Sequence, residues 1–510
     1  MNWIIDANPC PGVFYGTPAQ DGFLLRIRTP GGRLSLAQGR AIARWMEAWG
    51  SDRLQVTNRA NLQLRSLSQA PTPEIFTELK RLGLAAPIPQ VDQLRNIMAS
   101  PTAGIDAHEL LDTRPWVQAL DKYIQQHRRL EALPAKFSIG VDGGAAVAIG
   151  TRSPLAWEHR YNEIQLSVVA ADGSEADSSG WVHLAFGAGK KMHDTGCLIP
   201  PNQVVAAVAA LTQAYLDYLS QAEPLPKPGR KRRMTHLLAD WGLERYVQQA
   251  TSYQPDAFVG GQQVSLSPSV GAAHLGVHGQ RQPGLAYVGV DLPLGQLTLA
   301  QLQGVLAIVE RFAPGPLRLT PWQSLIVANI AEDQVERVLE QLQGLGLSGQ
   351  VPGLAIAACA GKPGCKSAAT ATQTDARRLL AELPQQIEQQ MGEQMGQKIG
   401  QQIGQQIGQQ MGLETPVNIH LTACPKSCAQ PGSAEITLLG IAQDTYQLYL
   451  GDGRDAWKYD LGSVTVDDLS PLLGRVLQRY QQQRHSPEES LTAWARRSEQ
   501  AGVRLQEWLS

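Results

Sequence analysis

Residues 30–38 read PGGRLSLAQ, and residues 293–301 read PLGQLTLAQ. The two stretches align without a gap at an offset of 263 residues, and the match continues downstream, where Thr57 falls on Thr320. Further matched pairs are Leu54 and Leu317, Leu62 and Leu325, Leu64 and Val327, Leu79 and Leu342, and Gly83 and Gly346. A repeat of this length is too long for a solenoid unit, so it predicts a duplicated half domain.

Each copy of the repeat shows a strand–helix–strand–helix pattern. In the first copy, residues 23–29 (FLLRIRT) form a predicted strand, and Ser35 is the predicted N-cap of a helix that runs to about Trp49. Residues 53–67 alternate as two further strand pieces, and residues 73–82 form a second helix. This order is the ferredoxin-like pattern, so the predicted fold class is α+β with two ferredoxin-like half domains.

Two cysteine pairs follow the second copy: Cys359 with Cys365 (C-x₅-C), and Cys424 with Cys428 (C-x₃-C). Four thiolates from two loops are a donor set for a 4Fe–4S cluster. The first gap is wide for a structural zinc site, which usually draws on C-x₂₋₄-C knuckles. Zinc binding and four unrelated buried cysteines are the alternatives. The flanking Gly, Pro and Lys residues favour a cluster, because they let amides approach the sulfurs and offset negative charge.

The two copies differ in their polar residues. In the first copy four polar residues alternate with leucines, and a period of two places them on one strand face. They are Arg59, Asn61, Gln63 and Arg65, where the second copy has Trp322, Ser324, Ile326 and Ala328. Arg95, Asn96 and Lys136 also follow the first copy. One half therefore predicts an anion-binding surface and the other a cluster holder, in a pseudo-two-fold arrangement around one crevice. A solvated strand face is the alternative for the polar residues.

The composition is that of an ordinary globular protein, with 43% hydrophobic and 18% charged residues and a formal net charge of −2. A net charge this close to zero argues against general nucleic-acid binding. No apolar run approaches the roughly 18–20 residues that span a membrane, and the N-terminal residues lack a secretory signal pattern. Six cysteines do not indicate a disulfide scaffold. We therefore expect a cytoplasmic protein without membrane or nucleic-acid partners.

Several stretches together resemble the nitrite/sulfite reductase superfamily. They are residues 57–63 (TNRANLQ), Arg95-Asn96, residues 133–137 (LPAKF) and the two cysteine pairs, and they occur in the family's order over nearly the whole chain. The resemblance implies that tetrapyrrole or substrate is bound by Arg59, Asn61, Gln63, Arg95, Asn96 and Lys136. It implies that the cluster is bound by Cys359, Cys365, Cys424 and Cys428, and it assigns no catalytic residue.

Within the superfamily, three details resemble the precorrin-3B synthases. They are Cys10-Pro11-Gly12, residues 136–144 (KFSIGVDGG) and residues 424–432 (CPKSCAQPG). One departure separates the chain from the sulfite reductases, which are basic on both sides of the Phe137 position. Here the flanking residues are Ala135 and Ser138. The loss of two cations weakens the reductase interpretation, because a small oxyanion reduced on iron needs clustered positive charge.

This resemblance implies an oxidoreductase of aerobic cobalamin biosynthesis, a monooxygenase that hydroxylates precorrin-3A with dioxygen and closes a γ-lactone. Its 4Fe–4S cluster would pass electrons from NADH or ferredoxin, and a mononuclear non-haem iron is also associated with the family. His420, His183 and His193 are candidate iron ligands, each with a structural role as the alternative. Asp142 either orients substrate or is an ordinary turn residue. The alternative functions are a ferredoxin-dependent sirohaem (haem-type) reductase of nitrite or sulfite, and a tetrapyrrole-binding electron carrier or regulator.

The resemblance and the repeat together predict the domain layout of a monomer. Its parts are half domain 1 (residues 1–90), an α+β tetrapyrrole-binding domain (91–222), a basic Pro-rich linker and helix (223–262), half domain 2 (263–350), a 4Fe–4S domain (351–480) and a C-terminal helix (481–510). Within the 4Fe–4S domain, residues 385–412 are a Gln/Gly-rich insert with Ile or Met at every fourth position. Its interior glycines each cost about 1 kcal/mol against alanine, which predicts a marginal helix or a mobile insertion.

Overall fold

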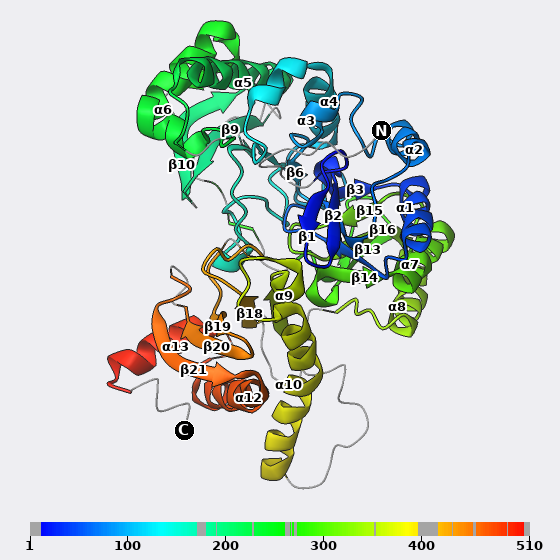
Figure 1. Ribbon diagram of the computed structural model, residues 1–510, viewed down its shortest axis with the longest axis vertical. Helices are drawn as coiled ribbons and strands as arrows, with labels where there is room; N and C mark the ends of the chain where they lie inside the picture. Colours follow the sequence, from blue (N-terminus) through cyan, green and yellow to red (C-terminus); the bar gives the residue numbers. More distant parts are fainter. Residues whose placement is uncertain are drawn as a thin grey trace. The chain divides into compact units, whose positions relative to one another are not determined.

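The computed structural model of the chain describes residues 12–170, 180–189, 191–226, 229–260, 266, 268–269, 273–350, 353–395, 417–430, 432–451, 455–486 and 488–503. The chain forms two compact units. Unit 1 holds Gly22–Leu292 and Gln296–Gly349 together with the residues up to Pro18. Unit 2 holds Gln350–Ser510 and two short stretches, Ala19–Asp21 and Pro293–Gly295. The elements are labelled in Figure 1, where unit 2 runs from yellow to red.

Unit 1 contains two five-stranded antiparallel sheets, one for each copy of the repeat. The first has the order β1-β2-β5-β4-β14 and the second the order β12-β13-β16-β15-β3. The strands of the first sheet are β1 (Thr17–Ala19), β2 (Gly22–Ile27), β5 (Leu62–Leu67), β4 (Arg53–Val56) and β14 (Gln296–Thr298). Those of the second are β12 (Gly276–Gly279), β13 (Leu285–Val290), β16 (Leu325–Ala331), β15 (Leu317–Leu319) and β3 (Arg33–Leu34).

The repeat seen in the sequence is a repeat of structure. An offset of 263 residues carries β2 onto β13 and α1 (Leu36–Trp49) onto α7 (Leu299–Phe312) without a shift. The same offset relates α2 (Pro73–Arg81) to α8 (Val335–Gly344), which begins one residue early. The N-cap predicted at Ser35 forms a capping box with Gln38, and its counterpart at Thr298 forms another. The predicted α+β class with duplicated ferredoxin-like half domains is therefore confirmed.

The two half domains exchange a short strand. β3 leaves the first copy and pairs with β15 of the second, with Leu34 opposite Leu317. β14 leaves the second copy and pairs with β4 of the first. The exchange passes through Gly32, which has a φ of +68° and whose Cβ, if present, would lie 2.3 Å from the carbonyl oxygen of Leu319. Glycine is required there, because both the conformation and the space exclude a side chain.

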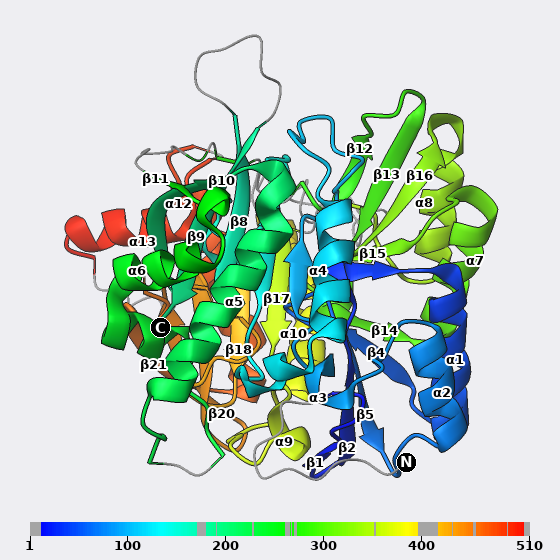
Figure 2. The ribbon, with the colours of Figure 1, turned by 90° about the horizontal axis from the view of Figure 1, so that it is seen from above.

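One hydrophobic core joins the two half domains. α1 packs against α7, and these helices lie side by side in both ribbon views (Figures 1 and 2). Gly39 on α1 allows the approach, since a Cβ there would lie 2.5 Å from a methyl group of Leu306. Core side chains from both copies, including Leu25, Ile42, Val288 and Val305, are completely buried. The duplication is thus closed into a single body by burial of apolar surface.

The rest of unit 1 is built on a six-stranded sheet of order β11-β10-β9-β8-β7-β6. The strands are β6 (Ile97–Ala99), β7 (Ile139–Asp142), β8 (Ile164–Val169), β9 (Trp181–Ala188), β10 (Lys191–Ile199) and β11 (Val259–Gly260). β6, β7 and β8 are parallel, and the remaining neighbours are antiparallel. The helices are α3 (Pro89–Asp92), α4 (Arg114–Gln126), α5 (Val204–Gln221) and α6 (Met234–Tyr253). α5 and α6 pack on each other, and α6 also packs on β9 and β10.

The basic segment between α5 and α6, predicted as part of a linker, is held within unit 1. Arg233 donates two hydrogen bonds to Glu163, at 3.0 and 3.1 Å. Burial raises the pKa of Glu163, although the charge of Arg233 opposes this. Arg232 pairs with Asp240 on α6 at 2.8 Å. These ion pairs make the segment a packed connection between two helices of one unit.

Unit 2 repeats the strand order of the six-stranded sheet. Its sheet has the order β17-β18-β19-β20-β21, with two parallel pairs followed by two antiparallel pairs. The strands are β17 (Leu354–Ala358), β18 (Val417–Thr422), β19 (Ile436–Ala442), β20 (Thr445–Leu450) and β21 (Tyr459–Thr465). The helices are α9 (Gly361–Gly364), α10 (Thr372–Met395), α12 (Val466–Gln483) and α13 (Leu491–Gln500). The duplication therefore extends to both α+β parts of the chain.

Two sequence predictions fall on unit 2. α10 runs through the first part of the Gln/Gly-rich insert, to Met395, and the remainder of the insert lies outside the described residues. A C-terminal helix was expected over residues 481–510, and α13 forms its middle part. Ser490 caps α13 by accepting a hydrogen bond from the amide of Ala493.

Candidate functional site

Hydrogen bonds join the three predicted tetrapyrrole-binding stretches in unit 1. Asn61 donates from its side-chain amide to Asn96 at 3.2 Å, and Asn96 donates to the carbonyl oxygen of Phe137 at 3.3 Å. Asn61 also accepts from the backbone amide of Thr29 at 3.0 Å. Asn61 and Asn96 are both buried. They connect residues 57–63, 95–96 and 133–137 into one hydrogen-bonded network.

The polar residues of the first copy do not share one strand face as predicted. β5 begins at Leu62, so Arg59 and Asn61 lie in the preceding turn, where Ala60 has a positive φ of 53°. Gln63 is on the strand, is 7% exposed and accepts a hydrogen bond from Arg26 at 2.7 Å. A solvated face is also excluded for Asn61 and Gln63, because both are buried. Arg59 is half-buried and Lys136 is exposed.

Arg95 is held in a buried ion pair. Its guanidinium donates two hydrogen bonds to Asp121, at 2.7 and 3.0 Å, and one to the carbonyl oxygen of Gly83 at 2.9 Å. Asp92 lies 3.5 Å away on the other side. Burial alone would lower the pKa of Arg95, but the two carboxylates outweigh it and the pKa is raised. The charge of Arg95 is therefore paired with carboxylates of α4 and α3. This geometry does not favour the predicted role of Arg95 as an anion contact.

The structure adds a cation that the sequence analysis missed. Arg160 is buried, with its Nε donating to the carbonyl oxygen of Pro321 at 3.0 Å. Desolvation lowers the pKa of Arg160 to about 10, the charge of Glu158 opposes this, and the charge of Arg59 lowers the pKa further. The charges of Arg59 and Arg160 therefore act on each other, with the carboxylates of Glu158 and Glu163 also within range of these cations. In the sequence, the run WEHRYNE at residues 157–163 could have indicated Arg160, because it concentrates charged residues immediately before a buried strand.

Both cysteine pairs lie at the same edge of the sheet in unit 2. β17 and β18 are parallel neighbours, and Cys359 follows the end of β17 while Cys424 follows the end of β18. The sulfur of Cys359 accepts a hydrogen bond from the amide of Ala423 at 3.2 Å, which ties the two loops together. A second tie runs from Lys426 to the hydroxyl of Ser367 at 3.0 Å.

The donor set fits an iron–sulfur cluster in its chemistry. Cys359, Cys365 and Cys424 are partly buried and Cys428 is exposed, and none of the four is in a disulfide. Three exposed lysines stand in the same loops, at positions 362, 366 and 426. Within the described residues, no three His, Cys, Asp or Glu side chains converge enough to hold a metal ion, and this includes the cysteines. The two loops would therefore have to close around a cluster to bring all four sulfurs onto it.

The first α+β part has no cysteine at the matching positions. The amide of Cys359 donates to the carbonyl oxygen of Leu421 at 3.1 Å, and the amide of Ser100 donates to that of Val141 at 3.3 Å. These equivalent hydrogen bonds join the end of β17 to β18 and the end of β6 to β7. In this register Ser100 stands where unit 2 has Cys359, and Gly144 stands where it has Cys424.

The remaining candidates from the sequence are part of the folded framework. His183 is buried on β9 and its Nε2 lies 2.7 Å from a carboxylate oxygen of Asp194. His420 is buried within β18, and His193 lies on β10. Asp142 is fully buried and accepts from Arg152 at 2.6 Å. Among the described residues no set of three ligands supports the mononuclear iron.

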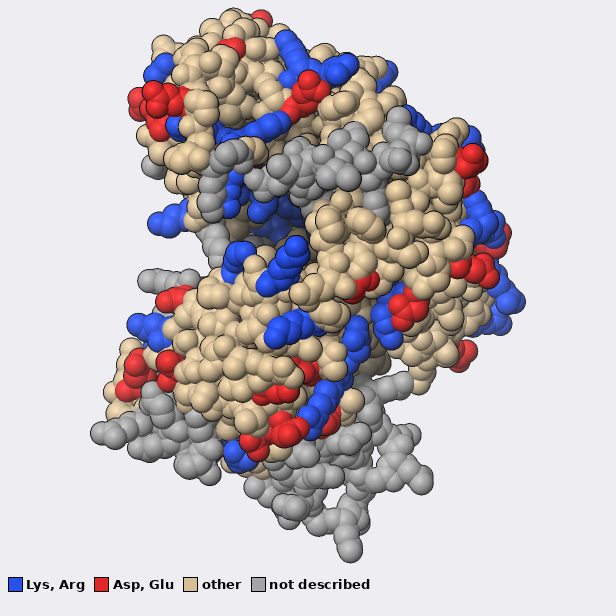
Figure 3. Space-filling model, in the orientation of Figure 1, with Lys and Arg blue, Asp and Glu red and all other residues tan. Residues whose placement is uncertain are grey.

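Charges of both signs alternate along one edge of unit 1. Lys and Arg alternate with Asp and Glu along the edge that carries α1 and α7 (Figure 3), where Arg40 pairs with Glu310 and Arg44 with Glu78. None of the helices in the described part of the chain has both the length and the apolar character needed to cross a membrane.

Two family models match the chain. The nitrite/sulfite reductase ferredoxin-like half domain matches twice, at residues 16–82 and 278–345. The nitrite and sulphite reductase 4Fe-4S domain matches residues 90–257. The second match covers the first α+β part, whose only cysteine in the sequence is Cys197, so the four paired cysteines lie outside it. Together the matches span more than half of the chain.

Curated relatives are similar over almost the full length. A ferredoxin–nitrite reductase of Synechococcus elongatus is 29% identical over 91% of this chain and 88% of the relative. A sulfite reductase [ferredoxin] of Mycolicibacterium paratuberculosis is 26% identical over 94% of this chain and 83% of the relative. The solved structure of the Mycobacterium tuberculosis NirA protein has the same fold, with a TM-score of 0.74 at 22% identity, over 96% of this chain and 85% of that one.

These relatives contradict the predicted activity. They are named as reductases of nitrite or sulfite that use ferredoxin, so the prediction of a cobalamin-pathway monooxygenase acting on precorrin-3A and dioxygen is wrong. The prediction gave too much weight to Ala135 and Ser138. Ser138 is fully buried and accepts a hydrogen bond from the amide of Glu163, so its position is part of the packing, while Arg160 supplies a cation near Arg59. The chain belongs to the nitrite/sulfite reductase superfamily of oxidoreductases.

Proposed function

We propose that this protein is a ferredoxin-dependent sirohaem reductase with nitrite as its substrate. The observation that carries the proposal is the coincidence of two features in one chain. Asn61 and Asn96 join the three stretches of unit 1 that were predicted to bind tetrapyrrole, and unit 2 brings two cysteine pairs to one sheet edge. The names of the full-length relatives support the same reaction class.

The residues of unit 1 would hold anions. Arg59 presents a half-buried guanidinium, whose planar fork suits the carboxylates of a tetrapyrrole, and Arg160 reinforces the positive potential there. Lys136 presents an exposed ammonium on the stretch that Asn96 fixes through Phe137. These cations would orient an anionic group.

The residues of unit 2 would hold the second group. Cys359, Cys365, Cys424 and Cys428 are the proposed ligands of a 4Fe–4S cluster, and the amide of Ala423 already donates to one of these sulfurs. When bound, sirohaem would supply the iron at which the oxyanion is reduced, and the cluster would supply the electrons.

The relatives favour nitrite over sulfite as the substrate. The Synechococcus elongatus relative, which is named a ferredoxin–nitrite reductase, is 29% identical to this chain. The Mycolicibacterium paratuberculosis relative, which is named a sulfite reductase, is 26% identical.

Anaerobic purification of the full chain from cells that make sirohaem tests the proposal. We expect the red-region absorption of sirohaem, and nitrite consumption with reduced methyl viologen at a higher kcat/KM than sulfite consumption. Lys136→Met should raise the KM for nitrite, whereas Lys122→Met, which removes an exposed lysine from α4, should not. A protein without sirohaem that consumes neither anion would overturn the proposal, and a preference for sulfite would overturn the choice of substrate.

A further inference from the structure

Unit 1 contains an arginine-lined cavity, and Arg95 is the residue of the predicted tetrapyrrole-binding set that lines it. Its volume is about 500 Å³, and its walls come from the loop before β3, the start of α1, the end of β6, α4 and the start of β15. Arg59, Asn96 and Lys136 do not line it. The arginines in its wall are Arg33, Arg95, Arg114 and Arg318.

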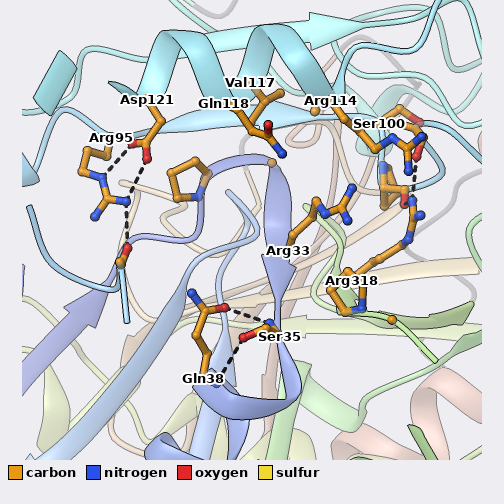
Figure 4. A pocket seen from close by; sticks show the side chains of 18 of the residues that line it. Arg33, Ser35, Gln38, Arg95, Ser100, Arg114, Val117, Gln118, Asp121 and Arg318 are labelled. Carbon is orange, nitrogen blue, oxygen red and sulfur yellow. Dashed lines mark hydrogen bonds and ion pairs between the residues drawn. The ribbon is translucent and has the colours of Figure 1, made fainter. Parts of the chain in front are cut away.

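Two of these arginines are neutralised by carboxylates. Figure 4 shows Arg95 on one side of the cavity, turned to Asp121, with which it forms the ion pair described above. On the other side Arg114 forms a bidentate pair with Asp112, with a shortest distance of 2.6 Å. The positive charge that remains for a ligand therefore belongs to Arg33 and Arg318.

Arg318 is buried without a carboxylate partner in the described part of the chain. It is 4% exposed, and one terminal nitrogen donates to the carbonyl oxygens of Pro101 and Ala103, both at 2.8 Å. Its Nε is buried and has no hydrogen-bond partner among the residues that the structure describes. A buried cation with an unused donor is costly, and an anion that accepts from it would remove the cost.

The exchanged strand β3 pairs with β15, and this pairing places Arg33 directly opposite Arg318. Desolvation and the charge of Arg114 lower the pKa of Arg33, while Asp112 opposes them. Desolvation lowers the pKa of Arg318 to about 9, the charges of Arg33 and Arg114 lower it further, and the charges of Glu109 and Asp112 oppose this. Three guanidinium groups thus repel one another on one wall of the cavity, and Figure 4 shows them grouped there.

The helix that starts at the cavity adds to its positive potential. α1 has 14 residues, and its first turn has no acidic residue. Its N-cap Ser35 lines the cavity together with Leu36 and Gln38 of the first turn. The N-terminal end of a helix carries partial positive charge and favours anions. The side chains of Ser35 and Gln38 are already engaged in the capping box, so the helix contributes through its dipole.

We propose that this cavity binds a phosphate dianion, either free or as the head group of a small phosphomonoester, between Arg33 and Arg318. Neither guanidinium group forms an ion pair with a carboxylate in the described part of the chain, so the two match two negative charges, and their forked donors match phosphate oxygens. The cavity is much larger than one phosphate, which leaves room for the organic part of an ester. This site is independent of the proposed reductase activity.

Calorimetric titration of the full-length protein, in chloride buffer at low ionic strength, tests the site with inorganic phosphate and glucose 6-phosphate as probes. We expect saturable one-to-one binding that is weakened about 10-fold or more by Arg33→Gln, which removes one charge-assisted contact. Arg40→Gln is the matched control, because Arg40 is an exposed arginine on the same helix α1 and pairs with Glu310.

Arg318→Lys keeps the charge and removes the fork, so it should weaken binding less than Arg33→Gln does. Tighter binding of glucose 6-phosphate than of inorganic phosphate would identify an ester as the ligand, and the reverse would identify free phosphate. Binding of neither probe, or equal binding by wild-type protein and Arg33→Gln, would overturn the proposal whatever the protein does with nitrite.

Discussion

We expect Gly32→Ala to destabilise the protein far more than Gly50→Ala, although both glycines have nearly the same backbone conformation. Their φ angles are +68° and +64°. A left-handed conformation costs an alanine about 1–2 kcal/mol, and this cost is common to both variants. A Cβ on Gly50 would meet nothing within 4 Å, whereas one on Gly32 would lie 2.3 Å from the carbonyl oxygen of Leu319.

The size of the difference follows from the strand exchange. An ordinary contact between carbon and a carbonyl oxygen is about 3.3–3.6 Å, so the chain at Gly32 must move by about 1 Å. The next two residues pair with β15, and Leu34 is completely buried. Loss of that pairing costs about 1 kcal/mol for each hydrogen bond, and partial exposure of a leucine costs up to about 2 kcal/mol. We expect about 3–5 kcal/mol for Gly32→Ala and about 1 kcal/mol for Gly50→Ala.

Urea unfolding of the full-length variants, followed by tryptophan fluorescence, measures the two effects side by side. The midpoint for Gly50→Ala should lie close to that of the wild type, and the midpoint for Gly32→Ala should be clearly lower. If Gly32→Ala fails to accumulate as folded protein while Gly50→Ala does, the ranking stands. Equal midpoints would show that the exchanged strand can shift without cost, and the argument from close contact would be refuted.

Three further predictions concern the site and the stability of its surroundings. Cys428→Ser should abolish cluster iron, sulfide and turnover, whereas Cys197→Ser should leave the iron and sulfide content unchanged; unaltered iron in the first variant would contradict the ligand assignment. Burial raises the pKa of Glu435 from 4.5 to about 7, so the folded protein binds this proton more tightly than the unfolded chain does. The free energy of unfolding should therefore fall by up to about 3 kcal/mol as the pH rises from 4.5 through 7. Glu435→Gln should flatten this pH dependence of the unfolding free energy, and an unchanged profile would exclude the group. Asn96→Ala removes hydrogen bonds to two carbonyl oxygens, including that of Phe137. This variant should lower the free energy of unfolding in urea by about 2–4 kcal/mol and raise the KM for nitrite. A KM equal to that of the wild type would show that the hydrogen bonds of Asn96 do not affect substrate binding.

The elements of the half domains could be predicted because their signals are local and occur twice. Ser35 begins a helix through a capping box that involves only Gln38, three residues away. The matching box at Thr298 repeats the evidence at an offset of 263 residues. The exchange of β3 and β14 could not be predicted, because each strand is only two or three residues long and its partner belongs to the other copy.

The site residues were predicted by position better than by role. Asn61 and Asn96 are hydrogen-bonded to each other, but both are buried and connect parts of the framework. Arg95 is engaged in an ion pair with Asp121. Asp121 lies on α4, 26 residues away, and no local pattern indicates that it faces Arg95. The choice of reaction failed for a related reason. Ser138 was read as a missing cation, whereas only the fold shows that its position is buried and that Arg160 supplies positive charge elsewhere.

The two α+β parts have the same backbone arrangement, but they differ in chemistry where their parallel strands end. In the first, the carboxylate of Asp142 accepts hydrogen bonds from the amides of Gly144 and Ile149, and in the strand register Asp142 stands where the second sheet has Thr422. In the second, the hydroxyl of Thr422 donates to the carbonyl oxygen of Cys424, and the amide of Ala423 donates to the sulfur of Cys359. The equivalent ends of two parallel strands are thus followed by amides that donate to a carboxylate in one part and by an amide that donates to a thiol in the other. This difference follows from the residues alone, because the strand order and the hydrogen bonds that join the strand ends are the same in both parts.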